Sequence, residues 1–273
     1  MIFNKITTLA LILILFSCNN QNPSNSKKEV DQSFQNKGHE LVYNMVQKVG
    51  NYNQLMDKKD VSYTYSYTTP DGKQDISTEK YIFDGELSYG LYNKHERTMP
   101  QLEGPIEQGY NGSDYWLKHN GKKLTDAKLL KRVVFSRPTN FYWFTMMQKL
   151  LDPGLNYKYL GEKEIDNDTY EIVKITFNGK DDKPKDIYQL YLNKKTLLVD
   201  QFLFTVAEFG VVDVPFLMRL EYENVDGLLI PTKRKYKPSN WKADPNINEG
   251  SWILVDWSDI KFNTNLAKEI FEG

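Results

Sequence analysis

The sequence is poor in the residues from which active sites and metal centres are built. Its 273 residues include one cysteine, Cys18, and three histidines, His39, His95 and His119. A single cysteine excludes an intramolecular disulfide, and no histidine stands at a metal-ligand spacing from another. We therefore interpret the histidines as surface residues, and we predict neither a metal nor any other cofactor.

Local catalytic motifs are missing as well. The chain has no G-x-S-x-G nucleophile elbow and no glycine-rich phosphate loop. A carboxylate pair assembled from distant strands would leave no such motif, so the absence concerns local patterns. On these patterns we predict that the protein is not an enzyme.

Neither sign of charge is in excess. Lys and Arg total 35 against 36 Asp and Glu, which leaves a net charge of −1. Nucleic-acid-binding domains carry a basic bias, so we expect no nucleic-acid partner. Hydrophobic residues make up 40% of the chain and aromatic residues 14%, which is enough for a folded core. One β-rich domain can have this length.

The longest apolar run near the start is too short for a membrane span. Lys5 precedes Leu9–Phe16, which has the length of a signal-peptide core. At its end, Leu15-Phe16-Ser17-Cys18 resembles the bacterial lipobox, in which the cysteine is acylated and becomes the mature N-terminus. The alternative is an ordinary secretory signal with an unrelated cysteine. On the lipobox interpretation, acylated Cys18 anchors the protein in a membrane.

These features divide the chain into three parts. Residues 1–17 are predicted to be a lipoprotein signal peptide. Residues 18–37 are rich in Asn, Ser, Gln and Lys without an apolar period, which predicts a flexible tether. Residues 38–273 show no composition break and are predicted to form a single domain.

Four consecutive strands are predicted late in the chain. They are Asp186–Leu192, Leu197–Thr205, Phe216–Val225 and Leu228–Tyr236, and the last two flank the tight turn Asp226-Gly227. Strands this close in sequence pair antiparallel. The two middle strands are apolar on both faces, so something must cover the second side of the sheet.

The clearest strand is predicted at Val61–Thr69. Tyr63, Tyr65 and Tyr67 alternate with polar residues and share one face. This face either packs under a helix, which we favour, or forms the aromatic wall of a lipid pocket. The segment 93–108 contains two prolines and a glycine, and it predicts a loop.

Helices are predicted at Gly38–Asp57, at Asp126–Phe135 with Asp126 as N-cap, and after the break at Pro138 as far as Leu151. The last of these is apolar all round, which is typical of a helix that is buried or that faces an apolar cavity. Residues on it are candidates for a cavity lid: Phe141, Phe144, Met146, Met147 and Leu150.

The expected fold is mainly β (α+β), a curved antiparallel half-barrel sheet of about ten strands with helices covering the concave face. A sheet of that many twisted strands is expected to curl. Three late stretches carry a family resemblance: Tyr191-Leu192-Asn193, Tyr222–Pro231 and Asp259–Asn263. They resemble the LolA/LolB-like lipoprotein carrier and receptor superfamily, and the whole chain is similar to uncharacterised lipoproteins of Bacteroidota. Cys18 departs from the soluble carrier, which lacks a lipid anchor.

The resemblance implies a cell-envelope lipoprotein, in the outer membrane, that binds a lipid or another hydrophobic ligand in the half-barrel. Its partners would be the membrane, through acylated Cys18, and an acyl-chain ligand. The alternatives are a structural or interaction lipoprotein with a filled core, and a glycan-binding surface lipoprotein that uses aromatics such as Trp241, Trp252 and Trp257.

Overall fold

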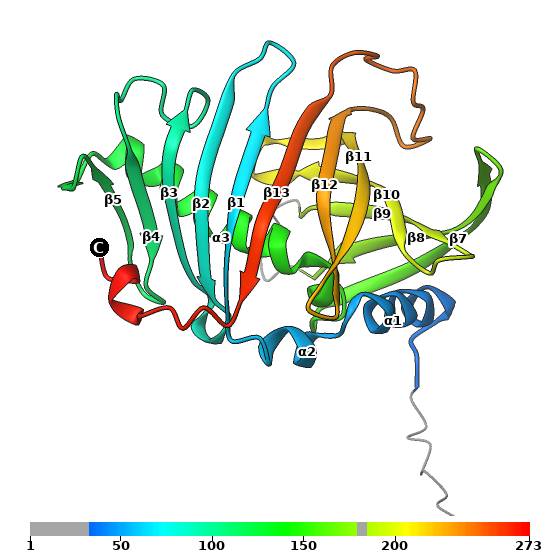
Figure 1. Ribbon diagram of the computed structural model, residues 1–273. Helices are drawn as coiled ribbons and strands as arrows, with labels where there is room; N and C mark the ends of the chain where they lie inside the picture. Colours follow the sequence, from blue (N-terminus) through cyan, green and yellow to red (C-terminus); the bar gives the residue numbers. More distant parts are fainter. Residues whose placement is uncertain (1–32, 179–184) are drawn as a thin grey trace, which may run out of the picture. The chain divides into compact units, whose positions relative to one another are not determined.

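One antiparallel sheet curves around a long helix (Figure 1). The computed structural model describes residues 33–178 and 185–273. Within them, thirteen strands run in chain order as β1 (Asp60–Thr68), β2 (Gln74–Ile82), β3 (Leu87–His95), β4 (Ile106–Tyr110), β5 (Tyr115–His119), β6 (Lys122–Leu124), β7 (Leu155–Ile165), β8 (Asp168–Phe177), β9 (Ile187–Asn193), β10 (Val199–Val206), β11 (Val211–Val225), β12 (Leu228–Pro238) and β13 (Ile253–Phe262). The helices are α1 (Lys37–Val49), α2 (Tyr52–Met56) and α3 (Ala127–Lys149), with short 3-10 turns η1 (Asp84–Glu86), η2 (Ala207–Phe209) and η3 (Lys268–Phe271).

The sheet consists of two meanders joined in the middle. Strands β1 to β6 pair in sequence, and so do β7 to β13, while β1 pairs with β13. The sheet stays open, with β6 and β7 at its two ends. The predicted curved, open antiparallel sheet of half-barrel type is confirmed. The described strands exceed the expected ten because the short strands β4 and β6 are not predicted. Strand β4 begins at Ile106, inside the segment 93–108 that predicts a loop, and continues to Tyr110.

Helix α3 corrects the prediction of two helices separated at Pro138. It runs unbroken from Ala127 to Lys149 with Pro138 inside it, and the Asp126 side chain caps its start by accepting the Leu129 N–H at 2.9 Å. Proline removes one backbone hydrogen bond from a helix and usually kinks or breaks it. Here the neighbouring residue, Arg137, is fixed in the core by an ion pair, and this tertiary contact outweighs the local cost.

The first predicted helix is also divided differently. Gly50, with φ +98°, ends α1, and Asn51 then caps α2 through a capping box with Gln54. Helix α1 packs against β7, β8, β12 and α3, so it covers one end of the barrel (Figure 1). No helix in the described ranges is long and apolar enough to cross a membrane.

Helix α3 divides the interior into two apolar clusters. Its C-terminal part packs with α1 and the strands from β7 to β11, through residues such as Met146, Met147 and Leu150. Phe141 and Phe144 pack instead with β1, β2 and β13. The space between these two clusters, next to the middle of α3, is not closed by side chains.

Candidate ligand-binding pocket

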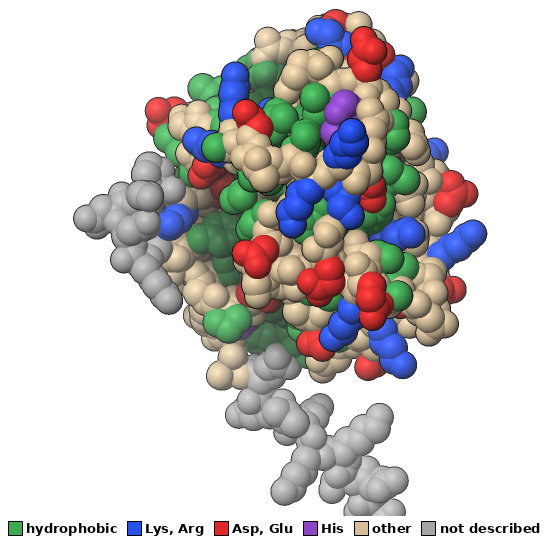
Figure 2. All heavy atoms as spheres, turned by 90° about the vertical axis from the view of Figure 1, so that its left-hand side faces the viewer, with side chains coloured by type: hydrophobic (Ala, Val, Ile, Leu, Met, Phe, Trp, Pro, Cys, Tyr) green, Lys and Arg blue, Asp and Glu red, His purple; other side chains and the backbone are tan. Residues whose placement is uncertain are grey.

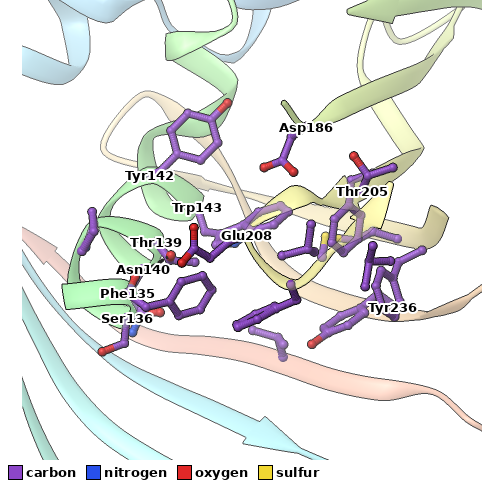
Figure 3. Close-up of a pocket in the computed structure, with 18 of the residues that line it drawn as sticks. Phe135, Ser136, Thr139, Asn140, Tyr142, Trp143, Asp186, Thr205, Glu208 and Tyr236 are labelled. Atoms are coloured by element: carbon purple, nitrogen blue, oxygen red, sulfur yellow. Dashed lines mark hydrogen bonds between the residues drawn. The ribbon is translucent and has the colours of Figure 1, made fainter. Parts of the chain in front are cut away.

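A cavity of about 830 Å³ lies between the middle of α3 and the concave face of the sheet. Phe135, Thr139, Tyr142 and Trp143 line it from the helix. Strands β1 and β10 to β13 supply most of the opposite wall. Figure 3 shows Tyr142 and Thr139 on the helix, with Thr205 and Tyr236 across the cavity.

The strands supply these side chains through their two-residue period, which places alternate residues on one face. On β12 the inward series is Leu228, Ile230, Thr232, Arg234 and Tyr236. Its first two members are core residues, and Arg234 and Tyr236 reach the pocket. The alternation therefore places one arginine on a face whose other members are apolar, aromatic or, at Thr232, uncharged.

The tyrosine face predicted on β1 is divided between core and pocket. Tyr63 is in the core, where it stacks on Phe144 at 5.0 Å between ring centroids. Tyr65 and Tyr67 line the pocket, and the Tyr67 hydroxyl lies 2.6 Å from that of Tyr236. The structure thus brings two of the three tyrosines to the cavity.

The predicted lid residues are placed in packed clusters. Phe141, Phe144, Met146, Met147 and Leu150 are all buried, and none of them lines the cavity. Other positions of the same helix do so, among them Thr139, Tyr142 and Trp143. Cys18 lies outside the described residues.

Aromatic rings form a continuous wall around the centre of the pocket. Phe204 lies 5.2 Å from Trp143, 5.4 Å from Phe216 and 5.7 Å from Tyr236, between ring centroids. Such rings bury large areas and suit a hydrocarbon ligand.

Arg234 is the most unusual charged residue of the pocket. Its side chain stacks on the Trp257 ring at 3.8 Å, while Nε donates to the Pro231 carbonyl at 3.0 Å and Nη2 to the Trp143 carbonyl at 2.9 Å. Burial lowers the pKa of Arg234 to about 10, so the guanidinium stays charged at neutral pH.

Two further arginines line the pocket, at a less buried position. Arg97 pairs with Asp75 at 3.1 Å and stacks on the Tyr67 ring at 4.0 Å. Arg132 is exposed, and both partial burial and the proximity of Arg97 lower its pKa. These two cations belong to one positive region near the N-terminal half of α3.

Two carboxylates also line the cavity, Asp186 ahead of β9 and Glu208 in η2 (Figure 3). The Asp186 carboxylate accepts the Ala207 N–H at 2.7 Å, and burial raises the pKa of Asp186. No group of three His, Cys, Asp or Glu side chains in the described ranges could hold a metal ion.

One expectation about a single residue is wrong, and one alternative loses a candidate residue. His95 was expected at the surface but is buried, with its ring nitrogens 3.0 Å from the Met99 carbonyl and 2.7 Å from the Gly104 carbonyl. It holds the β3–β4 loop in place. Trp257, one of the aromatics that the glycan-binding alternative would use at the surface, is buried in the pocket wall, where it supports Arg234.

One face of the described part of the molecule carries no large patch of a single charge. Figure 2 shows the end of the molecule at which β5 lies, with Lys, Arg, Asp and Glu side chains intermixed and hydrophobic side chains visible in a recess. This mixture agrees with the nearly neutral composition.

Comparisons with known proteins give one family model and several similar solved structures. A model described as a family of unknown function (DUF6503) matches residues 109–212, which include all of α3. No curated protein matches the chain. Among solved structures, a DUF1329 family protein from Desulfovibrio piger is 18% identical with a TM-score of 0.50, over 86% of this chain and 95% of that chain.

Two other solved structures are similar at lower scores. An outer membrane lipoprotein-sorting protein domain from Vibrio parahaemolyticus is 11% identical with a TM-score of 0.49, over 86% of this chain and 96% of that chain. A LolA superfamily protein from Nitrosomonas europaea is 14% identical with a TM-score of 0.46, over 82% of this chain and 98% of that chain. At 18% identity, the likeness to the Desulfovibrio piger protein shows that this chain has the same fold.

Proposed function

We propose that the protein is a cell-envelope lipoprotein that binds a hydrophobic ligand in the pocket between α3 and the sheet. The observation that carries the proposal is the cavity of about 830 Å³ with its aromatic wall. Small-molecule sites are typically concave, mostly apolar and roughly 300–1,000 Å³ in volume. The open space favours ligand binding over the filled-core alternative.

Filling the cavity tests this proposal. Thr139→Trp places a large ring on the pocket side of α3, at a half-buried position. Val134→Trp is the matched control, because Val134 lies on the same helix, is 47% exposed and does not line the cavity. Binding of the neutral fluorophore N-phenyl-1-naphthylamine to the purified protein is the measurement.

We expect Thr139→Trp to weaken binding of the fluorophore at least about tenfold, and Val134→Trp to leave it unchanged. Native mass spectrometry of gently purified protein gives an independent measurement, because a co-purifying lipid would appear as added mass. Wild-type protein that carries no lipid and binds no fluorophore at micromolar concentration would contradict the proposal.

We further propose that acylated Cys18 attaches the protein to a membrane, with residues 1–17 as the signal peptide, 18–37 as a tether and 38–273 as the binding domain. The position of Cys18 directly after an apolar run supports this. Cys18→Ala should move the protein from the membrane fraction to the soluble fraction, or leave the precursor uncleaved. Unchanged fractionation and unchanged labelling by a fatty-acid probe would refute the assignment.

The proposed role is binding and transfer without chemistry. The resemblance of the late strands to the LolA/LolB-like superfamily supports a place in the cell envelope. A protein with this role releases its ligand unchanged, which mass spectrometry of the recovered ligand would verify.

A further inference from the structure

Arg234 is a buried cation whose charge the described residues leave uncompensated. The residue is 5% exposed, and no carboxylate of the described ranges lies within ion-pair distance of it. Its electrostatic neighbours are the tyrosines Tyr222, Tyr63 and Tyr65. A buried charge without a counter-charge is costly, and proteins keep such groups where they are paired or where they function.

The bonds that Arg234 does make leave part of its guanidinium available. Nε and Nη2 are occupied by two backbone carbonyls, and Nη1 has no hydrogen-bond partner in the described part of the chain. The Trp257 indole N–H beside it is also buried without a partner there. Both side chains line the pocket. Two donors without acceptors therefore lie at the same wall of an apolar cavity.

We propose that the ligand is an amphiphile with a single anionic head, a carboxylate or a phosphate, which Arg234 binds while the hydrocarbon tail lies against the aromatic wall. This inference rests on the proposed function and specifies its ligand. Guanidinium groups pair with both kinds of oxyanion through charge-assisted hydrogen bonds. The two pocket carboxylates, Asp186 and Glu208, are not among the groups that act on Arg234, so they do not neutralise it.

The test compares three ligands with the same twelve-carbon tail on delipidated protein by calorimetry at pH 7.5. Dodecanol carries no charge, whereas dodecanoate and dodecyl phosphate distinguish the two head groups. We expect the better of the two anions to bind at least about tenfold more tightly than dodecanol, because hydrogen bonds to charged groups are the stronger ones.

Arg234→Met removes the charge and keeps a long apolar side chain. It should abolish the preference for the anion while the affinity for dodecanol stays within about twofold. Arg234→Lys should restore part of the preference, because it retains a charge but not the planar guanidinium. Lys195→Gln is the control, because it removes an exposed cation that does not line the pocket, and it should leave the preference intact. Arg132→Gln tests whether the exposed pocket cation supplies the preference instead.

The failures of the two proposals are distinguishable. If none of the three ligands binds, the proposed function fails. If dodecanol binds as tightly as both anions, or if Arg132→Gln rather than Arg234→Met removes the preference, the ligand-binding function remains and the role of Arg234 is overturned. The comparison of ligands on the wild-type protein requires no variant, so it decides whether an anionic head is preferred even if Arg234→Met does not fold, and Arg234→Lys and Arg132→Gln then assign the preference to one arginine.

Discussion

Two arginines are buried at α3, Arg137 within the helix and Arg234 on the facing strand β12, and only the first has a carboxylate partner among the described residues. Arg137 is fully buried, and its guanidinium donates to both oxygens of Glu79 at 2.8 and 3.3 Å and to the Tyr92 hydroxyl at 2.8 Å. Arg234 has backbone carbonyls and rings around it, and none of the described carboxylates pairs with it. The paired arginine lies in a closed site and the unpaired one lines a cavity. We infer from this difference that the charge of Arg137 stabilises the fold, whereas the charge of Arg234 is suited to binding a ligand.

The closed site around Arg137 is satisfied on almost every side. The Glu79 carboxylate also accepts from the Ser77 hydroxyl at 2.7 Å and from Tyr81 at 2.9 Å. Gly90 on β3 leaves room for the pair, because a Cβ there would come within 2.5 Å of Arg137 Nη1. Burial lowers the pKa of Arg137, but attraction to Glu79 outweighs it and raises the pKa above its ordinary value.

Breaking this pair should give the largest effect. Glu79→Gln keeps the shape of the side chain but leaves the buried Arg137 without its counter-charge. We expect the free energy of unfolding to fall by about 3–5 kcal/mol. Urea denaturation followed by circular dichroism is the measurement.

The double variant Glu79→Leu with Arg137→Met serves as the control, because it removes both charges together. It should recover at least half of the lost stability. A loss as large as that of Glu79→Gln would mean that packing, and not the unpaired charge, causes the effect.

Removing the unpaired arginine should cost less. Arg234→Met deletes two hydrogen bonds to carbonyls and, at the same time, relieves the protein of an uncompensated buried charge. We expect the free energy of unfolding to fall by no more than about 1–2 kcal/mol. If the same urea experiment shows a loss equal to that of Glu79→Gln, Arg234 is as structural as Arg137.

The pH dependence of stability distinguishes the two sites, because their contributions to the free energy of unfolding change in opposite directions as the pH rises above 10. Burial raises the pKa of Tyr92, beside Arg137, to about 12 from an ordinary value of 10. The folded state therefore holds this proton longer, and the stability it contributes below pH 10 is lost as the pH rises towards 12. Arg234 has a folded pKa below 12.5, so its unfavourable contribution is relieved above pH 10.

Tyr92→Phe should accordingly flatten the alkaline loss of stability. Relative to the wild-type protein, we expect the slope between pH 10 and 11.5 to change by about 1 kcal/mol per pH unit. Urea denaturation at several pH values gives the slope of the free energy of unfolding against pH. The hydrogen bond that the variant lacks lowers this free energy equally at every pH, so it does not change the slope. Parallel curves for the two proteins would contradict the assigned pKa.

The smallest effect is expected for charges at the surface. Lys195 on the β9–β10 turn pairs with Asp168 at 2.6 Å, and its side chain is 71% exposed. Lys195→Ala should change the free energy of unfolding by less than about 0.5 kcal/mol, because solvent and salt screen the pair. A loss above 1 kcal/mol would show that exposure is a poor guide to the strength of ion pairs in this protein.

The sequence predicts the strands and turns of this fold better than the residues that line the pocket. Alternation in Val61–Thr69 and the Asp226-Gly227 turn are local signals, and both lead to the observed strands β1, β11 and β12. Helix α3 continues through Pro138, and the adjacent Arg137 pairs with Glu79, which is 58 residues away in the sequence. A local pattern cannot reveal such a contact.

The pocket residues divide in the same way. Tyr65 and Tyr67 are found through the period of one strand, whereas Arg234 and Trp257 become neighbours only when β12 pairs with β13. The alternation Leu228, Ile230, Thr232, Arg234 contains a usable signal, since it places a cation on the buried face. What it cannot tell is whether a carboxylate from another strand pairs with that cation.

The pairing of β1 with β13 also has a consequence for the order of folding. Ser62 pairs with Lys261, and Asp60 accepts the N–H groups of Thr264 and Leu266, so the first strand is completed by residues that are synthesised much later, with Thr264 lying 204 positions after Asp60. Until then the first meander has an unpaired edge at β1, which is a template for pairing with another chain. Closure of so long a loop is slow. The protein therefore depends on its C-terminal strand to protect its earliest one, and a chain shortened before Ile253 would lose that protection.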